Sequence, residues 1–166
     1  MSGMSGDSDQ QAPEGIIIGP GEGRRIEIPG VSEVTTVKAA AADTSGKVSV
    51  HEEWHGADDT GVPRHFHHQL DEIFYILEGE MRFLVGQEEM VAGPGAFIYV
   101  PHGVVHAWRP VGVGPVRQLV IFIPGGFEGY LDEMQTVPLP QQDPVAWQEL
   151  NRRWDVEVVG PPLENG

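Results

Sequence analysis

Three histidines and one glutamate have the residue types and the spacing of a metal-binding site. His65 and His67 are separated by one residue, Glu72 follows shortly after, and His106 lies further along the chain. In a β-strand, residues i and i+2 point to the same face roughly 6.5–7 Å apart, so the two paired imidazoles can meet at one ion. Each residue also has a plainer interpretation. The pair could lie on the surface, Glu72 could be a solvated strand end, and His106 could be a core histidine whose hydrogen bonds are satisfied.

Taken together, three neutral imidazoles and one carboxylate form a mixed nitrogen and oxygen ligand set. Such a set suits Fe, Mn, Ni, Co, Cu or Zn, so the predicted cofactor is one divalent first-row transition metal. The sequence contains no cysteine, which excludes thiolate ligands, disulfides and a cysteine nucleophile. Four protein ligands leave one or two coordination positions open, which is typical of a catalytic metal site rather than a structural one.

Short strands must position these residues. From Gly15 onward, short apolar runs alternate with turns that contain Gly or Pro, such as Gly93-Pro94-Gly95. This pattern favours an all-β fold. The predicted strands are Ile16–Ile18, Arg24–Ile28, Glu33–Lys38, Lys47–Trp54, Pro63–His68, Glu72–Leu77, Met81–Val85, Glu88–Val91, Ala96–Val100, His106–Arg109 and Val116–Ile123.

The pattern changes towards the end of the chain. Apolar residues three to four positions apart over 127–134 predict a helix. Asp143-Pro144 resembles an N-cap and a first helical position, and Trp147, Leu150 and Trp154 follow at helical spacing. We expect a disordered polar tail over residues 1–14, a β-barrel over 15–123, and a helical and extended cover over 124–166, with both tryptophans packed in the core.

The composition narrows the class of partner. The chain has 166 residues and a formal net charge of −15, from 25 acidic and 10 basic residues. This length fits one domain, and the acidic charge argues against nucleic acid and anionic membrane surfaces as partners. No apolar run is long enough to cross a bilayer, and the first residues lack the regions of a signal peptide, so we predict a cytoplasmic location.

Two segments resemble the motifs of the cupin superfamily. His65-x-His67-x4-Glu72-x6-Gly79 is similar to the first cupin motif, and Gly95-x5-Pro101-x-Gly103-x2-His106 is similar to the second. The resemblance implies a jelly-roll barrel, also called a double-stranded β-helix, whose single metal is held by His65, His67, Glu72 and His106. The sequence departs from the motifs at Asp59, where the family often has Gly, and at Pro110, where it often has Asn. These departures concern turns rather than ligands.

Strand parity predicts the surroundings of the metal. Phe74, Ile76, Met81, Phe83 and Trp108 are the expected pocket lining, although small barrels also fill their interiors with such side chains. Glu52 shares a strand face with Val48, Val50 and Trp54, and would be a second carboxylate near the cavity if that face were interior. We expect His68 outside the barrel, His102 in a solvated turn, and His51 and His55 on the surface or in loops.

The chain further resembles bacterial single-domain cupins similar to quercetin 2,3-dioxygenase. This implies a metal-dependent dioxygenase acting on a small aromatic or enol-bearing compound, with Glu72 as catalytic base if apolar surroundings raise its pKa. Two alternatives stay open: a non-redox isomerase, cyclase or lyase, and a barrel that binds a small molecule without catalysis. A homodimer formed by adding an N-terminal strand to a partner's sheet also stays open.

Overall fold

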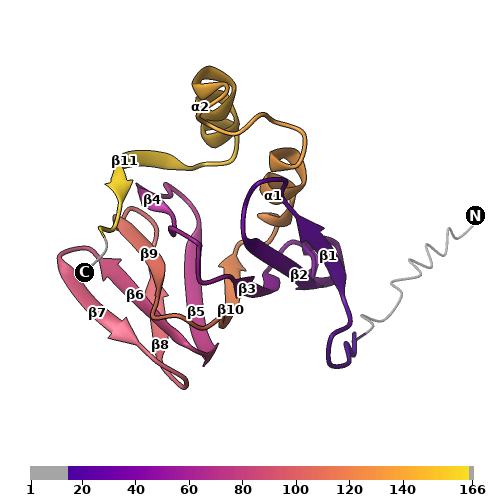
Figure 1. Ribbon diagram of the computed structural model, residues 1–166. Helices are drawn as coiled ribbons and strands as arrows, with labels where there is room; N and C mark the ends of the chain where they lie inside the picture. The colour runs from indigo at the N-terminus through magenta and orange to yellow at the C-terminus, as the bar shows by residue number, and fades with distance from the viewer. Residues whose placement is uncertain (1–14, 165–166) are drawn as a thin grey trace, which may run out of the picture.

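The computed structural model describes residues 15–164 and consists mainly of two antiparallel sheets. Its strands are β1 (Arg24–Glu27), β2 (Glu33–Ala39), β3 (Ser49–His55), β4 (Pro63–Phe66), β5 (Asp71–Glu78), β6 (Glu80–Val85), β7 (Glu88–Ala92), β8 (Phe97–Val100), β9 (His106–Val111), β10 (Val116–Ile123) and β11 (Glu157–Pro162). The first sheet has the order β1-β2-β3-β10-β5-β8, and the second has the order β11-β4-β9-β6-β7. Figure 1 shows the two sheets facing each other, which confirms the predicted all-β jelly-roll barrel.

The core between the sheets comes from strand positions of a single parity. On β5, Phe74 and Ile76 are buried while Tyr75 between them is exposed, and on β6 Met81 and Phe83 are buried. These side chains pack together in one apolar cluster that also contains Val120 and Phe122 of β10. Burial of this cluster is the main force that holds the two sheets together.

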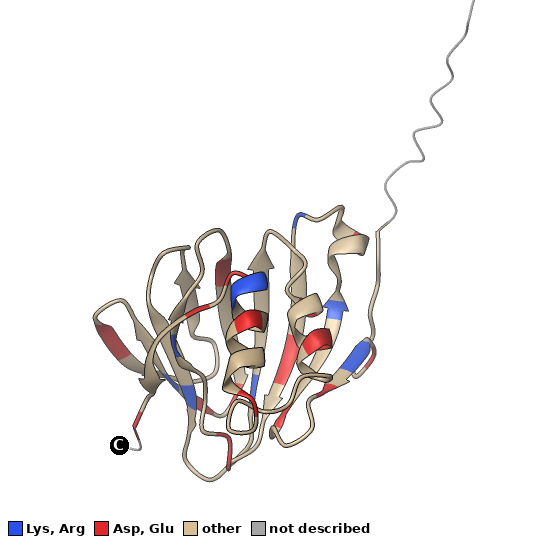
Figure 2. Ribbon diagram, turned by 90° about the horizontal axis from the view of Figure 1, so that it is seen from above, with Lys and Arg blue, Asp and Glu red and all other residues tan. Residues whose placement is uncertain are grey.

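Two helices cover one end of the barrel. They are α1 (Glu128–Met134) and α2 (Pro144–Arg153), and a short 3-10 turn, η1 (Ala41–Thr44), follows β2. Asp143 caps α2 by accepting a hydrogen bond from the backbone N–H of Ala146, as its position before Pro144 predicts. Figures 1 and 2 show α1 and α2 side by side above the strands, with acidic residues spread over strands and helices rather than gathered into one patch. No helix in the described part of the chain is long and apolar enough to cross a membrane.

The structure departs from the sequence expectations at several places. Ile16–Ile18 is not a strand, and the predicted tail over 1–14 lies outside the described residues. A strand not predicted within the C-terminal cover, β11, pairs with β4 and forms the edge of the second sheet. Of the two helical tryptophan positions, Trp147 lines the cavity under the helices, whereas Trp154 packs against Gly129 of α1.

The sequence also predicted the wrong environment for the two histidines of β3. His51 and His55 were expected on the surface or in loops, but both lie on a strand and are 0% exposed. Alternation along β3 buries Ser49, His51, Glu53 and His55 and leaves the opposite face, with Glu52 and Trp54, on the outside. Glu52 there pairs with Lys38 at 3.2 Å and with Arg117 at 3.5 Å. The parity of the strand was predictable, but which face the second sheet covers was not.

Candidate metal centre

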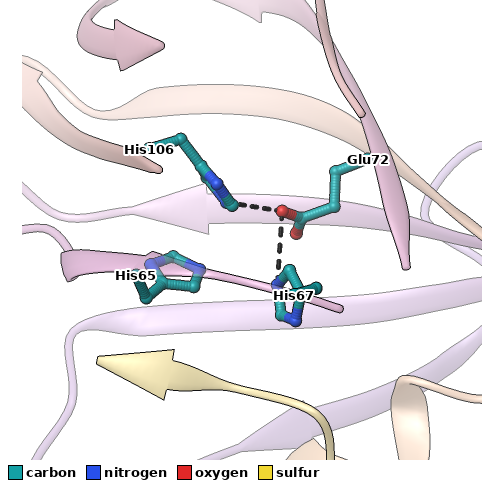
Figure 3. A group of neighbouring side chains, drawn as sticks. All are labelled: His65, His67, Glu72 and His106. Atoms are coloured by element: carbon teal, nitrogen blue, oxygen red, sulfur yellow. Dashed lines mark ion pairs between the residues drawn. The ribbon is translucent and has the colours of Figure 1, made fainter. Parts of the chain in front are cut away.

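Four side chains from three strands and one loop meet inside the barrel. His65 lies on β4 directly opposite His106 on β9, His67 follows the end of β4, and Glu72 lies on β5. One ligand atom from each of these residues lies within 4.8 Å of the others. His67, Glu72 and His106 are 1–5% exposed. The structure therefore brings together all four residues that the sequence singled out (Figure 3).

The imidazole rings are arranged around a common point. The ring centroids of His65 and His106 are 4.2 Å apart, those of His65 and His67 are 5.2 Å apart, and those of His67 and His106 are 5.7 Å apart. In Figure 3 the Glu72 carboxylate points between His67 and His106. These distances suit three rings that share one small ion.

A backbone carbonyl fixes the orientation of each ring. Nδ1 of His65 lies 2.8 Å from the carbonyl oxygen of Pro63, and Nδ1 of His106 lies 3.0 Å from that of Val104. Nδ1 of His67 lies 2.8 Å from the carbonyl oxygen of Asp155. A carbonyl oxygen only accepts hydrogen bonds, so each Nδ1 must carry the proton. In the neutral rings Nε2 then keeps its lone pair, which is the arrangement that metal-binding histidines use.

Three buried atoms of the site have no hydrogen bond. Nε2 of His67, Nε2 of His106 and Oε2 of Glu72 are inaccessible and without a hydrogen-bond partner among the described residues. Oε2 of Glu72 lies only 2.6 Å from Nε2 of His106 and 3.4 Å from Nε2 of His67, but not in the alignment of a hydrogen bond. Buried polar atoms without partners are costly. A cation between them would satisfy all three, so these residues fit a bound metal ion.

The protonation states also suit a cation. Burial alone would raise the pKa of Glu72, but the facing imidazoles of His106 and His67 outweigh burial and hold this pKa well below its usual range. Burial and the neighbouring His106 lower the pKa of His65 to about 4. At neutral pH the carboxylate is therefore charged and His65 keeps a free lone pair. The role of Glu72 as a base was made conditional on a pKa raised by apolar surroundings, and without a metal ion the facing imidazoles shift this pKa in the opposite direction.

A cavity of about 520 Å³ lies beside the four residues. His65 and Glu72 form part of its wall, together with Phe74 and Trp108. The other three residues predicted to line a pocket lie in the apolar core instead, at 0–1% exposure: Ile76, Met81 and Phe83. Tyr130 of α1, Trp147 of α2 and Phe127, which directly precedes α1, close the cavity from above.

The remaining histidines lie as follows. The side chain of His68 is 57% exposed and pairs with Glu157 at 2.9 Å, and that of His102 is 61% exposed and pairs with Asp71 at 2.7 Å. Both are therefore outside the metal centre, as expected. Sequence reasoning missed Asp155, because nothing in the sequence connects it with His67. It also missed Glu53 and His55, whose position on the buried face of β3 could have been recognised from the period-2 spacing of Ser49, His51, Glu53 and His55.

Comparison with known proteins places these features in a family. Residues 53–122 match the Cupin domain family. Quercetin 2,3-dioxygenase of Bacillus subtilis (strain 168) is 28% identical over 123 residues, which is 72% of this chain and 35% of that protein. The chain thus spans about a third of the length of this relative.

Solved structures share the fold. KdgF from Halomonas sp. has a TM-score of 0.60 and 16% identity, and the alignment covers 70% of this chain and 99% of that one. The polyketide cyclase RemF from Streptomyces resistomycificus has a TM-score of 0.56 and 20% identity, with 66% of this chain and 80% of that one covered. At such identities the likeness concerns the architecture of the barrel and not the reaction.

Proposed function

The chain is a member of the cupin superfamily, and on this premise we propose that it is a metal-dependent dioxygenase acting on a small aromatic or enol-bearing compound. The observation that carries the proposal is the convergence of unpaired Nε2 atoms and a carboxylate beside a partly apolar cavity. A bound Fe, Mn, Ni, Co or Cu ion would supply Lewis acidity and a path for electrons to O₂. The proposed ligands are His65, His67, Glu72 and His106.

The cavity supports a flat, apolar substrate. Phe74, Val120, Phe122 and Trp108 form part of its wall, and the roof adds Phe127 and Tyr130. The rings of Phe122 and Phe127 stack at 4.6 Å between centroids, so part of the cavity wall is aromatic. Such walls hold an aromatic ring by apolar contact and exclude water from it.

Glu72 is our candidate proton acceptor. It is the carboxylate that belongs both to the metal centre and to the cavity wall, and it is ionised at neutral pH. An ionised carboxylate at this place can accept the proton of a substrate enol or phenol.

A non-redox reaction is the second candidate. The same donor set of three imidazoles and one carboxylate accommodates redox-inert zinc, which would make the protein an isomerase, cyclase or lyase. A barrel that binds a small molecule without catalysis is the third. In each case we propose a small-molecule ligand and a cytoplasmic location, with a homodimer as an open possibility.

Metal analysis and oxygen uptake distinguish these candidates. The purified protein, and protein loaded with Fe, Mn or Ni, is assayed with flavonols and 1,3-diketones on an oxygen electrode. We expect metal-dependent oxygen consumption, lost in His106→Ala and kept in His102→Ala, whose exposed imidazole lies outside the site. Full occupancy by zinc with no oxygen uptake would favour the non-redox candidate. Retention of a small molecule with no bound metal would favour the binding barrel.

A further inference from the structure

A second group of titratable side chains lies in the same cavity, away from the metal centre. It consists of Glu33 on β2, Glu53 and His55 on β3, and Asp59 in the loop that follows; we call it the acidic cluster. Glu33, Glu53 and Asp59 belong to the cavity wall, as do His65 and Glu72 of the metal centre. A single cavity therefore connects the two groups.

Strand register gives the separation of the two groups. Phe122, Val120 and Gln118 of β10 point inward at successive steps, and Phe122 is paired with Glu72 whereas Gln118 is paired with Glu53. Four residues along a strand span about 13 Å. The wall between the two ends contains Val120 and Phe74 and is apolar. The cavity thus has a polar end on each side of an apolar middle.

His55 is the centre of the acidic cluster. It is 0% exposed, and its ring packs edge-on against Trp108 with centroids 4.6 Å apart. Nδ1 lies 2.9 Å from Oδ2 of Asp59 in hydrogen-bonding alignment, and Nε2 lies 3.5 Å from Oε2 of Glu53. Burial opposes the charged ring, but Asp59 and Glu53 outweigh burial and raise the pKa of His55 to about 10. With no metal ion bound, His55 is therefore a protonated imidazole at neutral pH.

Some carboxylate oxygens of the acidic cluster accept no hydrogen bond from the part of the protein that the structure describes. Oε1 of Glu33 accepts from the Thr35 hydroxyl at 2.9 Å and Oε2 of Glu53 accepts from Gln118 at 2.9 Å, but the second oxygen of each carboxylate accepts no hydrogen bond from the described residues. Gln118 is 0% exposed, and its amide nitrogen lies 3.2 Å from Nε2 of His55. The amide nitrogen thus points into the cluster, and the amide oxygen has no hydrogen-bond partner among residues 15–164.

The net charge of the acidic cluster also favours a ligand group that donates hydrogen bonds. Three carboxylates surround one imidazolium, so the cluster remains negative even if one carboxylate holds a proton. Burial and the nearby Glu53 raise the pKa of Glu33 to about 7, so this carboxyl exchanges its proton near neutral pH. Unfilled acceptors combined with negative charge select a ligand group that donates hydrogen bonds and exclude an anion.

We propose that the acidic cluster binds a hydrogen-bond-donating head group of the substrate, a hydroxyl or a protonated amine, while the other end of the same molecule lies at His65 and Glu72. This inference rests on the proposed function, because it takes the metal centre as the place where the enol end is held. It defines the substrate class further: a flat molecule with an acidic enol at one end, donor groups at the other, and no carboxylate or phosphate at the donor end.

Binding of matched ligands tests the proposal without turnover. Four 3-hydroxyflavones share one enol–ketone pair and differ only in the substituent at the far 4′ position of the pendant ring, which is methyl, hydroxymethyl, aminomethyl or carboxylate. Their affinities for the zinc-loaded protein are measured by calorimetry. We expect the hydroxymethyl or aminomethyl compound, or both, to bind about tenfold more tightly than the methyl compound. The carboxylate compound should bind most weakly. The better of the two donors identifies the head group as a hydroxyl or an amine.

Variants assign the preference to the cluster. Glu33→Gln and Glu53→Gln keep the size of each side chain, and either variant should reduce the preference for the donor compound severalfold while the methyl compound binds as before. Glu80→Gln removes an exposed carboxylate at the start of β6 and serves as the control. Two separate variants keep the test valid if one of them folds poorly.

Each contrary result has a distinct meaning. Equal binding of all four compounds, tightest binding of the carboxylate compound, or binding of a second zinc ion that Glu33→Gln removes would overturn this inference and leave the proposed function standing. No binding of any compound to protein that retains zinc at the first site would contradict enol binding at the metal centre. It would overturn the proposed function together with this inference.

Discussion

The backbone carbonyl of Asp155 accepts a hydrogen bond of 2.8 Å from Nδ1 of His67, although the two residues are 88 positions apart. The carboxylate of Asp155 also accepts hydrogen bonds from the backbone N–H groups of His68 and Gln69, at 3.1 Å and 2.8 Å. The connection between α2 and β11 therefore orients a proposed metal ligand and holds the loop that carries it. The C-terminal segment is thus part of the metal centre as well as a cover.

Replacing Asp155 should weaken metal binding without touching a ligand. Asp155→Ala removes both carboxylate acceptors, and its positive φ of 60° strains an alanine. We expect metal affinity to fall about 10–100-fold, the usual cost of losing a partner that orients a ligand. Asp155→Asn, which tolerates this backbone conformation and keeps one acceptor, should lose less. Competition with a chelator measures the affinities, and Glu157→Gln is the control. Unchanged affinity in Asp155→Ala would show that the loop does not position His67.

Metal removal should lower the stability of the protein. A ligand that binds only the folded state adds about 2.7 kcal/mol to the free energy of unfolding when its concentration is a hundred times its dissociation constant. We expect this gain with zinc in the wild type and in His102→Ala, and no gain in His106→Ala. Urea unfolding with and without a chelator measures it. Equal stabilisation of His106→Ala by zinc would rule out His106 as a ligand.

The protonated His55 should make stability depend on alkaline pH. Its pKa is raised to about 10 in the folded protein, against about 6.5 for a free histidine, so the folded state binds the proton more tightly. The stabilisation is complete below pH 6.5 and is lost as the pH rises through 10. Relative to His55→Gln, the wild type should therefore lose at least about 1 kcal/mol of unfolding free energy across this range. Denaturant titrations at several pH values measure the difference.

A titration of the His55 ring by NMR provides the direct check. Resonances that remain those of a protonated imidazole at pH 8 agree with the prediction, whereas a midpoint near that of a free histidine contradicts it. Asp59→Asn removes the carboxylate that Nδ1 contacts at 2.9 Å and should lower the midpoint.

The packing of α1 against Trp154 should tolerate no added methyl group. A Cβ at Gly129 would collide with the indole ring of Trp154 and force it to move. We expect Gly129→Ala to cost about 1–3 kcal/mol of unfolding free energy, as overpacking usually does, and to change tryptophan fluorescence. Gly114→Ala is the matched control, because nothing lies within 4 Å of a Cβ there. Equal stability of the two variants would mean that the cover over the cavity is loosely packed.

The sequence by itself determined the strands and the four proposed ligands. Short apolar runs between Gly and Pro turns indicated most strands to within a few residues, because turn chemistry and period-2 alternation are local properties. The i, i+2 spacing of His65 and His67 likewise depends on strand geometry alone. Resemblance to cupin motifs added His106, and in the structure it lies directly opposite His65.

Tertiary structure alone decided which faces are buried and which distant groups meet. Alternation on β3 separates Glu52 from Glu53 whichever face is inside, and only tertiary packing places Glu53 in the cavity wall and buries His55 behind it. Ile16–Ile18 has strand-like residues but pairs with no strand, whereas β11 becomes a strand by pairing with β4. The contact between Asp155 and His67 joins two loops, and no local pattern encodes it. The period-2 pattern of a strand indicates which residues share a face. Whether that face is buried depends on contacts with residues far away in the chain.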